Sequence, residues 1–121
     1  MTKQEQINKA IGAHGLWKQR LNEAIKTGKT EFTPDKVEVD NQCEFGKWLY
    51  SLPAEDLNCE FARKVKALHA DFHKEAASVL RLAVGGKQAE AEKGTQVNSK
   101  FAKISSELTV AMMSWKSKLP A

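Results

Sequence analysis

Residues 61–84 read FARKVKALHADFHKEAASVLRLAV, and this segment indicates a helical protein. Its apolar residues recur every three or four positions, which predicts a long helix with one buried face. The residues on that face are Phe61, Val65, Leu68, Phe72, Ala76, Val79 and Leu80. His69 and His73 stand four residues apart in the segment. Both imidazoles therefore lie on one helix face, where two ring nitrogens can meet one metal ion at roughly 2.0–2.1 Å.

The same spacing predicts helices on both sides of this segment. We expect a first helix over 4–27 that ends at Gly28, a loop over 30–42, a short helix over 43–50, a long helix over 54–84 and a last helix over 87–119. The inner face of the last helix is expected to carry Val97, Phe101, Ile104, Leu108, Met112, Trp115 and Leu119. No segment alternates as strands do. The expected fold is all-α, an antiparallel four-helix bundle with a short extra helix that carries Cys43.

Length and composition define the class of protein further. A chain of 121 residues is expected to form one domain, residues 1–121. Its net charge of +4 comes mostly from lysines mixed with acidic residues, which is typical of a solvated surface and not of a nucleic-acid interface. No run reaches the ~18 apolar residues of a membrane span, so we expect a cytoplasmic protein with its two cysteines as thiols. Met1 and the finish at 119–121 are typical of a complete small protein.

All three histidines and one of the two cysteines form a candidate metal site: His14, Cys43, His69 and His73. His14 lies on the apolar face of the first helix, which also carries Ile7, Ile11, Trp17, Leu21 and Ile25. The chain after that helix can extend by ~3.3 Å per residue, enough to return Cys43 to the depth of His14. The residues alone leave an alternative open, in which His14 is a hydrogen-bonded core histidine and Cys43 a small buried apolar residue. Burying three unpaired imidazoles is costly, and this favours a tetrahedral zinc site.

Several neighbours of these four residues have expected roles. Trp17, Phe45 and Trp48 are expected to pack around the site and exclude water, and Gly46 to allow close approach of the short helix. Cys59 precedes His69 by roughly 15 Å of helix, so it is not expected to share the metal. Asp71 is expected to face solvent.

Three motifs resemble the chemoreceptor zinc-binding (CZB) domains of bacterial signalling proteins. They are His14-Gly15-Leu16-Trp17 for H-x-x-W, Cys43-Glu44-Phe45-Gly46-Lys47-Trp48-Leu49 for C-x-F-G-x-W-[LI], and His69-Ala70-Asp71-Phe72-His73 for H-x-x-x-H. The resemblance implies a four-helix bundle with Zn²⁺ bound by His14, Cys43, His69 and His73. It also implies a homodimer and a partner such as a chemoreceptor or a diguanylate cyclase, although this chain carries no output domain.

These residues favour a binding module over a zinc enzyme. A zinc enzyme needs an open metal position and a nearby base, whereas four protein ligands leave none and Ala70 replaces the glutamate of H-E-x-x-H. We therefore expect no enzyme but a sensory or regulatory module for chemotaxis or cyclic-di-GMP signalling. It would respond to zinc or to oxidation of the Cys43 thiolate, for instance by hypochlorous acid. The alternative is a structural zinc site in a helical scaffold or dimerisation protein.

Overall fold

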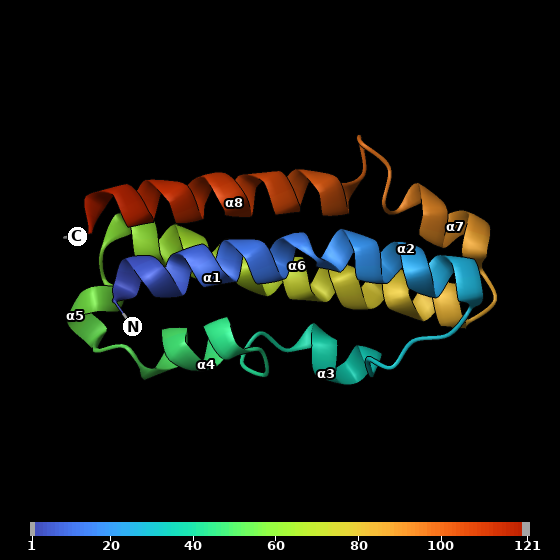
Figure 1. The fold of residues 1–121 in the computed structure, drawn as a ribbon, viewed down its shortest axis with the longest axis horizontal. Coiled ribbons are helices and arrows are strands. Elements are labelled where there is room, and N and C mark those ends of the chain that lie inside the picture. Colours follow the sequence, from blue (N-terminus) through green and yellow to red (C-terminus); the bar gives the residue numbers. More distant parts are fainter. Residues whose placement is uncertain (1, 120–121) are drawn as a thin grey trace.

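A computed structural model describes residues 2–119, and all regular elements in this range are helices (Figure 1). This confirms the all-α expectation. The helices are α1 (Lys3–Gly15), α2 (Trp17–Thr27), α3 (Pro34–Glu38), α4 (Glu44–Ser51), α5 (Ala54–Leu57), α6 (Glu60–Val84), α7 (Gln88–Lys93) and α8 (Lys100–Lys118).

The helices form four segments that alternate in direction (Figure 1). Helices α1 and α2 follow one line, α3 and α4 return beside them, α6 runs forward again, and α7 and α8 return. Helix α6 is central because it contacts α2, α3, α5, α7 and α8, while α1 contacts α4 and α8. The second segment thus consists of two short helices. The ends of the described chain meet where the Gln4 side-chain amide donates to the carbonyl of Leu119 (3.1 Å).

The expected first helix is interrupted at Leu16, between α1 and α2. Leu16 keeps right-handed helical dihedrals, and its carbonyl still accepts from the Arg20 amide at 3.1 Å. Gly12 and Gly15 weaken helix formation by about 1 kcal/mol each relative to alanine, which accounts for a break at this place. The helix axis nevertheless continues (Figure 1). Gly28 ends α2 in a left-handed conformation (φ 72°), as expected.

The loop expected over 30–42 was only partly right, because it contains α3. Thr33 and Pro34 occupy the N-cap and first helical positions, a pairing typical of helix starts. Val37 is buried and joins the core. The short helix expected over 43–50 is α4, and Cys43 is its N-cap residue.

The two other long helices are also divided. The segment 54–84 splits into α5 and α6, with Cys59 as the N-cap of α6. The segment 87–119 splits into α7 and α8, with Ser99 as the N-cap of α8. The prediction that Val97 is a core residue was wrong: its side chain is 84% exposed. Val97 lies in the turn between α7 and α8, where helical periodicity no longer applies.

The core follows the expected apolar faces elsewhere. Helices α6 and α8 bury most of the residues assigned to their inner faces, including Val65, Phe72, Leu80, Leu108 and Trp115. Phe61, Leu68, Leu119 and Ile11 are only half-buried at the edges. Across residues 2–119, no helix combines the length and apolar character that a membrane crossing requires.

Candidate metal centre

Three separate segments bring the four candidate ligands together. His14 is next to the last residue of α1, His69 and His73 lie midway along α6, and Cys43 precedes the first turn of α4. One nitrogen from each histidine and the cysteine sulfur lie within 4.8 Å of one another. The three histidines are buried and Cys43 is half-buried. The four residues singled out from the sequence therefore form one cluster inside the fold.

Two distances between candidate ligand atoms lie close to those of a tetrahedral zinc site. His69 Nε2 lies 3.3 Å from Cys43 Sγ and 3.0 Å from His73 Nε2. Zinc bonds of about 2.0 Å to nitrogen and 2.3 Å to sulfur separate tetrahedral ligand atoms by roughly 3.3–3.6 Å. Shifts of a few tenths of an ångström at these pairs would bring them to that separation.

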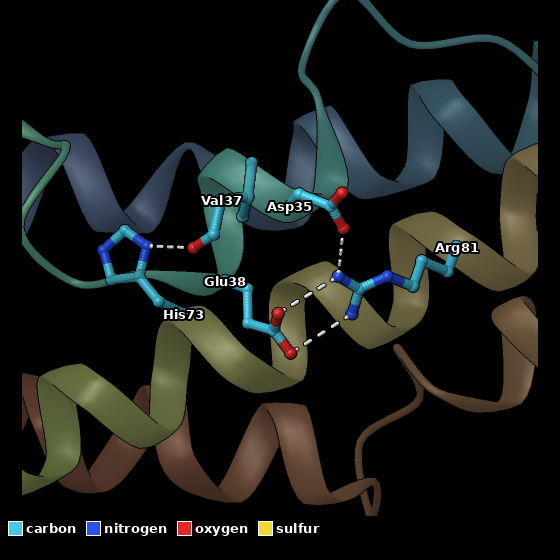
Figure 2. A network of polar contacts seen from close by, with 5 residues as sticks. All are labelled: Asp35, Val37, Glu38, His73 and Arg81. Atoms are coloured by element: carbon cyan, nitrogen blue, oxygen red, sulfur yellow. Dashed lines mark hydrogen bonds and ion pairs between the residues drawn. The ribbon is translucent and has the colours of Figure 1, made fainter.

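Backbone carbonyls orient two of the rings. His14 Nδ1 donates to the carbonyl of Ala10 at 2.8 Å, and His73 Nδ1 donates to the carbonyl of Val37 at 2.9 Å (Figure 2). A carbonyl oxygen only accepts, so both Nδ1 atoms carry hydrogen, and a neutral ring then presents an unprotonated Nε2. This is the arrangement in which a histidine binds a metal through Nε2 while its other nitrogen is held by a second group.

Burial keeps the rings neutral. It lowers the pKa of His14 to about 4, with smaller contributions from His73 and Arg20. It lowers the pKa of His69 to about 2, helped by His73 and His14, and it also lowers the pKa of His73. His69 Nδ1 is buried and has no hydrogen-bond partner among residues 2–119. Neutral imidazole is the form that binds metal, so these rings can act as ligands at neutral pH without first losing a proton.

Cys43 Sγ accepts a hydrogen bond from the Gly46 amide at 3.3 Å, at the N-terminus of α4. Burial raises the pKa of the Cys43 thiol, and the amides of Gly46 and Phe45 act in the opposite direction. Helix N-termini favour negative charge, and a metal ion deprotonates a thiol that binds it. The sulfur is thus placed where a bound cation would stabilise the thiolate and burial alone would not.

Gly46 allows the chain to cross close to α4. A Cβ atom at this position would collide with the carbonyl oxygen of Asp40 and lie 2.8 Å from its carbonyl carbon. The Asp40 carboxylate accepts from the Tyr50 hydroxyl at 3.0 Å, which joins the segment before Cys43 to the far end of α4. The expected close approach at Gly46 is therefore present, and its neighbour is the backbone of Asp40.

Aromatic side chains surround the cluster unequally. The Phe45 ring meets the edges of His14 (5.9 Å between centroids) and His69 (5.1 Å). Trp48 packs on Phe45 and on Trp115. Trp17 packs on Phe32 and under Arg20, beside the cavity that reaches His14 and Cys43.

Sequence reasoning missed three contributors to the site. Phe72 was assigned to the core, but its ring also meets His14 at 5.2 Å. The carbonyls of Ala10 and Val37 orient His14 and His73. Backbone acceptors have no residue-type signature, although Thr33-Pro34 signals the helix that carries Val37.

A small cavity of about 140 Å³ between α1, α2 and α4 reaches the cluster from the surface. His14, Cys43 and Phe45 line its inner part, and Lys9 pairs with Glu44 at 2.8 Å among its outer residues. The cavity therefore borders the cluster beside His14 and Cys43. Cys59 is exposed and lies outside the cluster, and Asp71 faces solvent, as expected.

The structure thus defines an all-helical protein whose cluster of three histidines and one cysteine fits a Zn²⁺ ion. Comparison with protein families gives a match to the chemoreceptor zinc-binding domain over residues 14–80, more than half of the chain. The protein belongs to this family, a family of zinc-binding domains, and the match confirms the resemblance read from the motifs. All four cluster residues lie in the matched region. No curated protein and no solved structure gives a significant match.

Proposed function

We propose that His14, Cys43, His69 and His73 bind one Zn²⁺ ion, and that the protein is a zinc-dependent regulatory module of bacterial signalling. The observation that carries this proposal is the convergence of three ring nitrogens and one sulfur within 4.8 Å, with two of the rings already oriented by backbone carbonyls. A donor set of three imidazoles and one thiolate suits tetrahedral zinc. Residues 1–121 act as a single domain of the four-helix-bundle type.

A binding role is better supported than catalysis. The cluster supplies four protein ligands and contains no carboxylate that could serve as a base. Catalytic zinc sites keep one position for water or substrate, whereas closed sites are structural or regulatory. The protein is therefore not an enzyme in this proposal.

Regulation would act through zinc occupancy or through the Cys43 sulfur. The ligands come from α1, α4 and α6, so loss of the ion would release contacts between three elements. A Cys43 thiolate reached through the cavity would react with hypochlorous acid to give sulfenic acid and chloride, a two-electron oxidation of sulfur. Sulfenic acid is a weaker ligand than thiolate, so oxidation would lower zinc affinity.

Membership of this family supports a partner in signalling. In this proposal the domain forms a homodimer in the cytoplasm and reports to a chemoreceptor or a diguanylate cyclase. The alternative function is a structural zinc site in a scaffold or dimerisation protein. The burial of the candidate ligands favours this structural alternative. A zinc ion among buried side chains can exchange so slowly that its only role is to stabilise the folded state.

Metal content tests the proposal. Protein purified without added metal is analysed by plasma mass spectrometry for the wild type, Cys43→Ala and His73→Ala, with circular dichroism before and after chelation. We expect about one zinc per wild-type chain, because residues 2–119 contain one four-ligand cluster, and loss of zinc in both variants. Helicity that survives chelation supports regulation, and unfolding on chelation supports the structural alternative. A wild type that binds no zinc at any concentration refutes both.

A further inference from the structure

Helix α3 packs against α6. It spans five residues, Pro34–Glu38, which is too short for stable helix formation by itself. Val37 is its buried residue. Its position on α6 must therefore come from tertiary interactions.

Arg81 supplies a polar part of these interactions. Its guanidinium bridges both ends of α3, with Nη2 at 2.8 Å from Asp35 Oδ1 and 3.2 Å from Glu38 Oε2, and Nη1 at 3.4 Å from Glu38 Oε1 (Figure 2). The planar guanidinium suits two carboxylates at once, and a lysine has no equivalent geometry. One residue of α6 thus fixes α3 at its first and last turns.

The position of α3 in turn determines two features of the cluster of candidate ligands. The Val37 carbonyl, between Asp35 and Glu38 in sequence, accepts from His73 Nδ1 at 2.9 Å (Figure 2). Residues 39–42 then lead directly from α3 to Cys43. A shift of α3 would therefore disturb the orientation of His73 and the approach of the cysteine together.

We propose that Arg81 is a positioning residue for zinc: by bridging Asp35 and Glu38 it holds α3 where the Val37 carbonyl orients His73 and where the chain delivers Cys43. This inference rests on the zinc site proposed above. The hydrogen bonds of Arg81 among residues 2–119 go to Asp35 and Glu38 and not to the candidate ligands, so it acts through α3. Because binding linkage is reciprocal, bound zinc also holds α3 against α6.

The test compares zinc binding and local opening in Arg81→Gln and the wild type. The zinc dissociation constant is measured by competition with a chromophoric chelator, and amide hydrogen exchange is followed over residues 34–42. Two exposed ion pairs contribute modestly, so we expect the dissociation constant to rise roughly 3- to 10-fold. We also expect faster exchange in 34–42 of the zinc-bound variant, with the Co²⁺-substituted spectrum unchanged because all four ligands remain.

Salt and a matched variant make the test specific. The difference in zinc dissociation constant between Arg81→Gln and the wild type should become smaller at about 1 M salt. At that concentration the Debye length is about 3 Å, so the ion pairs of Arg81 are screened. Lys100→Gln removes a similar surface pair, Lys100 to Glu75 at 3.9 Å, which joins α8 to α6 away from α3. It should leave zinc affinity and exchange in 34–42 as in the wild type. Equal affinities for Arg81→Gln and the wild type, or equal losses in both variants, overturn the role of Arg81 while leaving the zinc site intact. A wild type that binds no zinc overturns both proposals.

Discussion

At the scale of single residues, the protonation state of the candidate ligands is controlled by the fold. The hydrogens on Nδ1 of His14 and His73 are assigned by backbone carbonyls, which no side-chain substitution removes directly. His69 has no such acceptor for Nδ1 among residues 2–119, so its ring is oriented mainly by contacts with Cys43, His73 and Phe45. The three histidines thus differ in how much of their orientation precedes metal binding.

Gly46 provides a prediction with a matched control in the same chain. Gly46→Ala places a methyl group against the Asp40 carbonyl, so the loop before Cys43 must move. We expect a loss of about 1–3 kcal/mol in the free energy of unfolding, measured by urea denaturation, together with weaker zinc binding. In Gly12→Ala the new methyl group meets nothing within 4 Å, so this variant should gain about 0.5–1 kcal/mol. Equal effects of the two substitutions would contradict the crossing at Asp40.

The buried histidines predict acid sensitivity of the metal-free protein. The unfolded chain takes up protons near pH 6.5, whereas His14 in the folded protein does so only near a pKa of about 4. The stability contribution is therefore fully present above pH 6.5 and is lost as pH falls toward 4. For His14 the complete loss amounts to about 3 kcal/mol at 1.36 kcal/mol per pKa unit.

Urea denaturation in chelator across this pH range measures the effect. His14→Gln should show a shallower fall in stability than the wild type, because the glutamine does not titrate. A wild-type stability that stays constant between pH 7 and pH 4 would contradict neutral burial of the histidines.

At the scale of elements, both cysteines cap helices and have different consequences. Cys43 Sγ accepts from Gly46 at the start of α4, and Cys59 Sγ accepts from Ala62 at the start of α6, each at 3.3 Å. Cys43 faces the histidines, whereas Cys59 is exposed. The same capping hydrogen bond thus holds a candidate metal ligand at the start of α4, whereas at the start of α6 it only caps the helix.

Substitutions at Cys59 separate these roles. Cys59→Ala removes the cap of α6 and should cost about 0.5–1 kcal/mol in unfolding free energy, while Cys59→Ser should retain or improve stability. Both variants should bind as much zinc as the wild type, measured by plasma mass spectrometry. Loss of zinc in Cys59→Ser would show that the second cysteine participates in the site.

At the scale of the whole molecule, the apolar core and the candidate metal site are separate sources of stability. The core runs through α2, α6 and α8, well beyond the cluster, with Leu21, Leu80 and Leu108 buried. Chelation should therefore lower the thermal midpoint, as release of any ligand bound only by the folded state does, while far-ultraviolet circular dichroism at 25 °C changes little. Re-addition of zinc should restore the midpoint. A midpoint that chelator does not change in zinc-loaded protein would show that the ion does not stabilise this fold.

The outer face of α8 is a candidate interface for the proposed homodimer. Val110 and Met113 are 60% and 57% exposed, one turn apart on the last helix. If the proposed homodimer uses this face, light scattering should give twice the mass of one chain, and Val110→Glu with Met113→Glu should halve it. Lys64→Glu, on an exposed position of α6, is the control and should remain dimeric. A double variant that keeps the wild-type mass would place the interface elsewhere.

Residue spacing and motifs predicted the helical class, most of the buried faces of α6 and α8, and the four residues of the cluster. These properties depend on local spacing: apolar residues three or four apart share a helix face, and His69 and His73 are one turn apart on any helix. The same local rules failed where several breaks interrupt the pattern. Val97 fits the periodicity but lies in a turn, and α3 is a helix within an expected loop.

The way in which the cluster is held depends on the packing of distant segments. The carbonyls of Ala10 and Val37, the crossing of Asp40 over Gly46 and the bridge from Arg81 to α3 join groups that carry no mutual spacing in the sequence. Backbone acceptors are present at every residue, so sequence cannot indicate which of them meets a histidine. Ion pairs between distant elements depend on how those elements pack. The identities of the candidate ligands are local information, whereas their protonation and orientation result from packing.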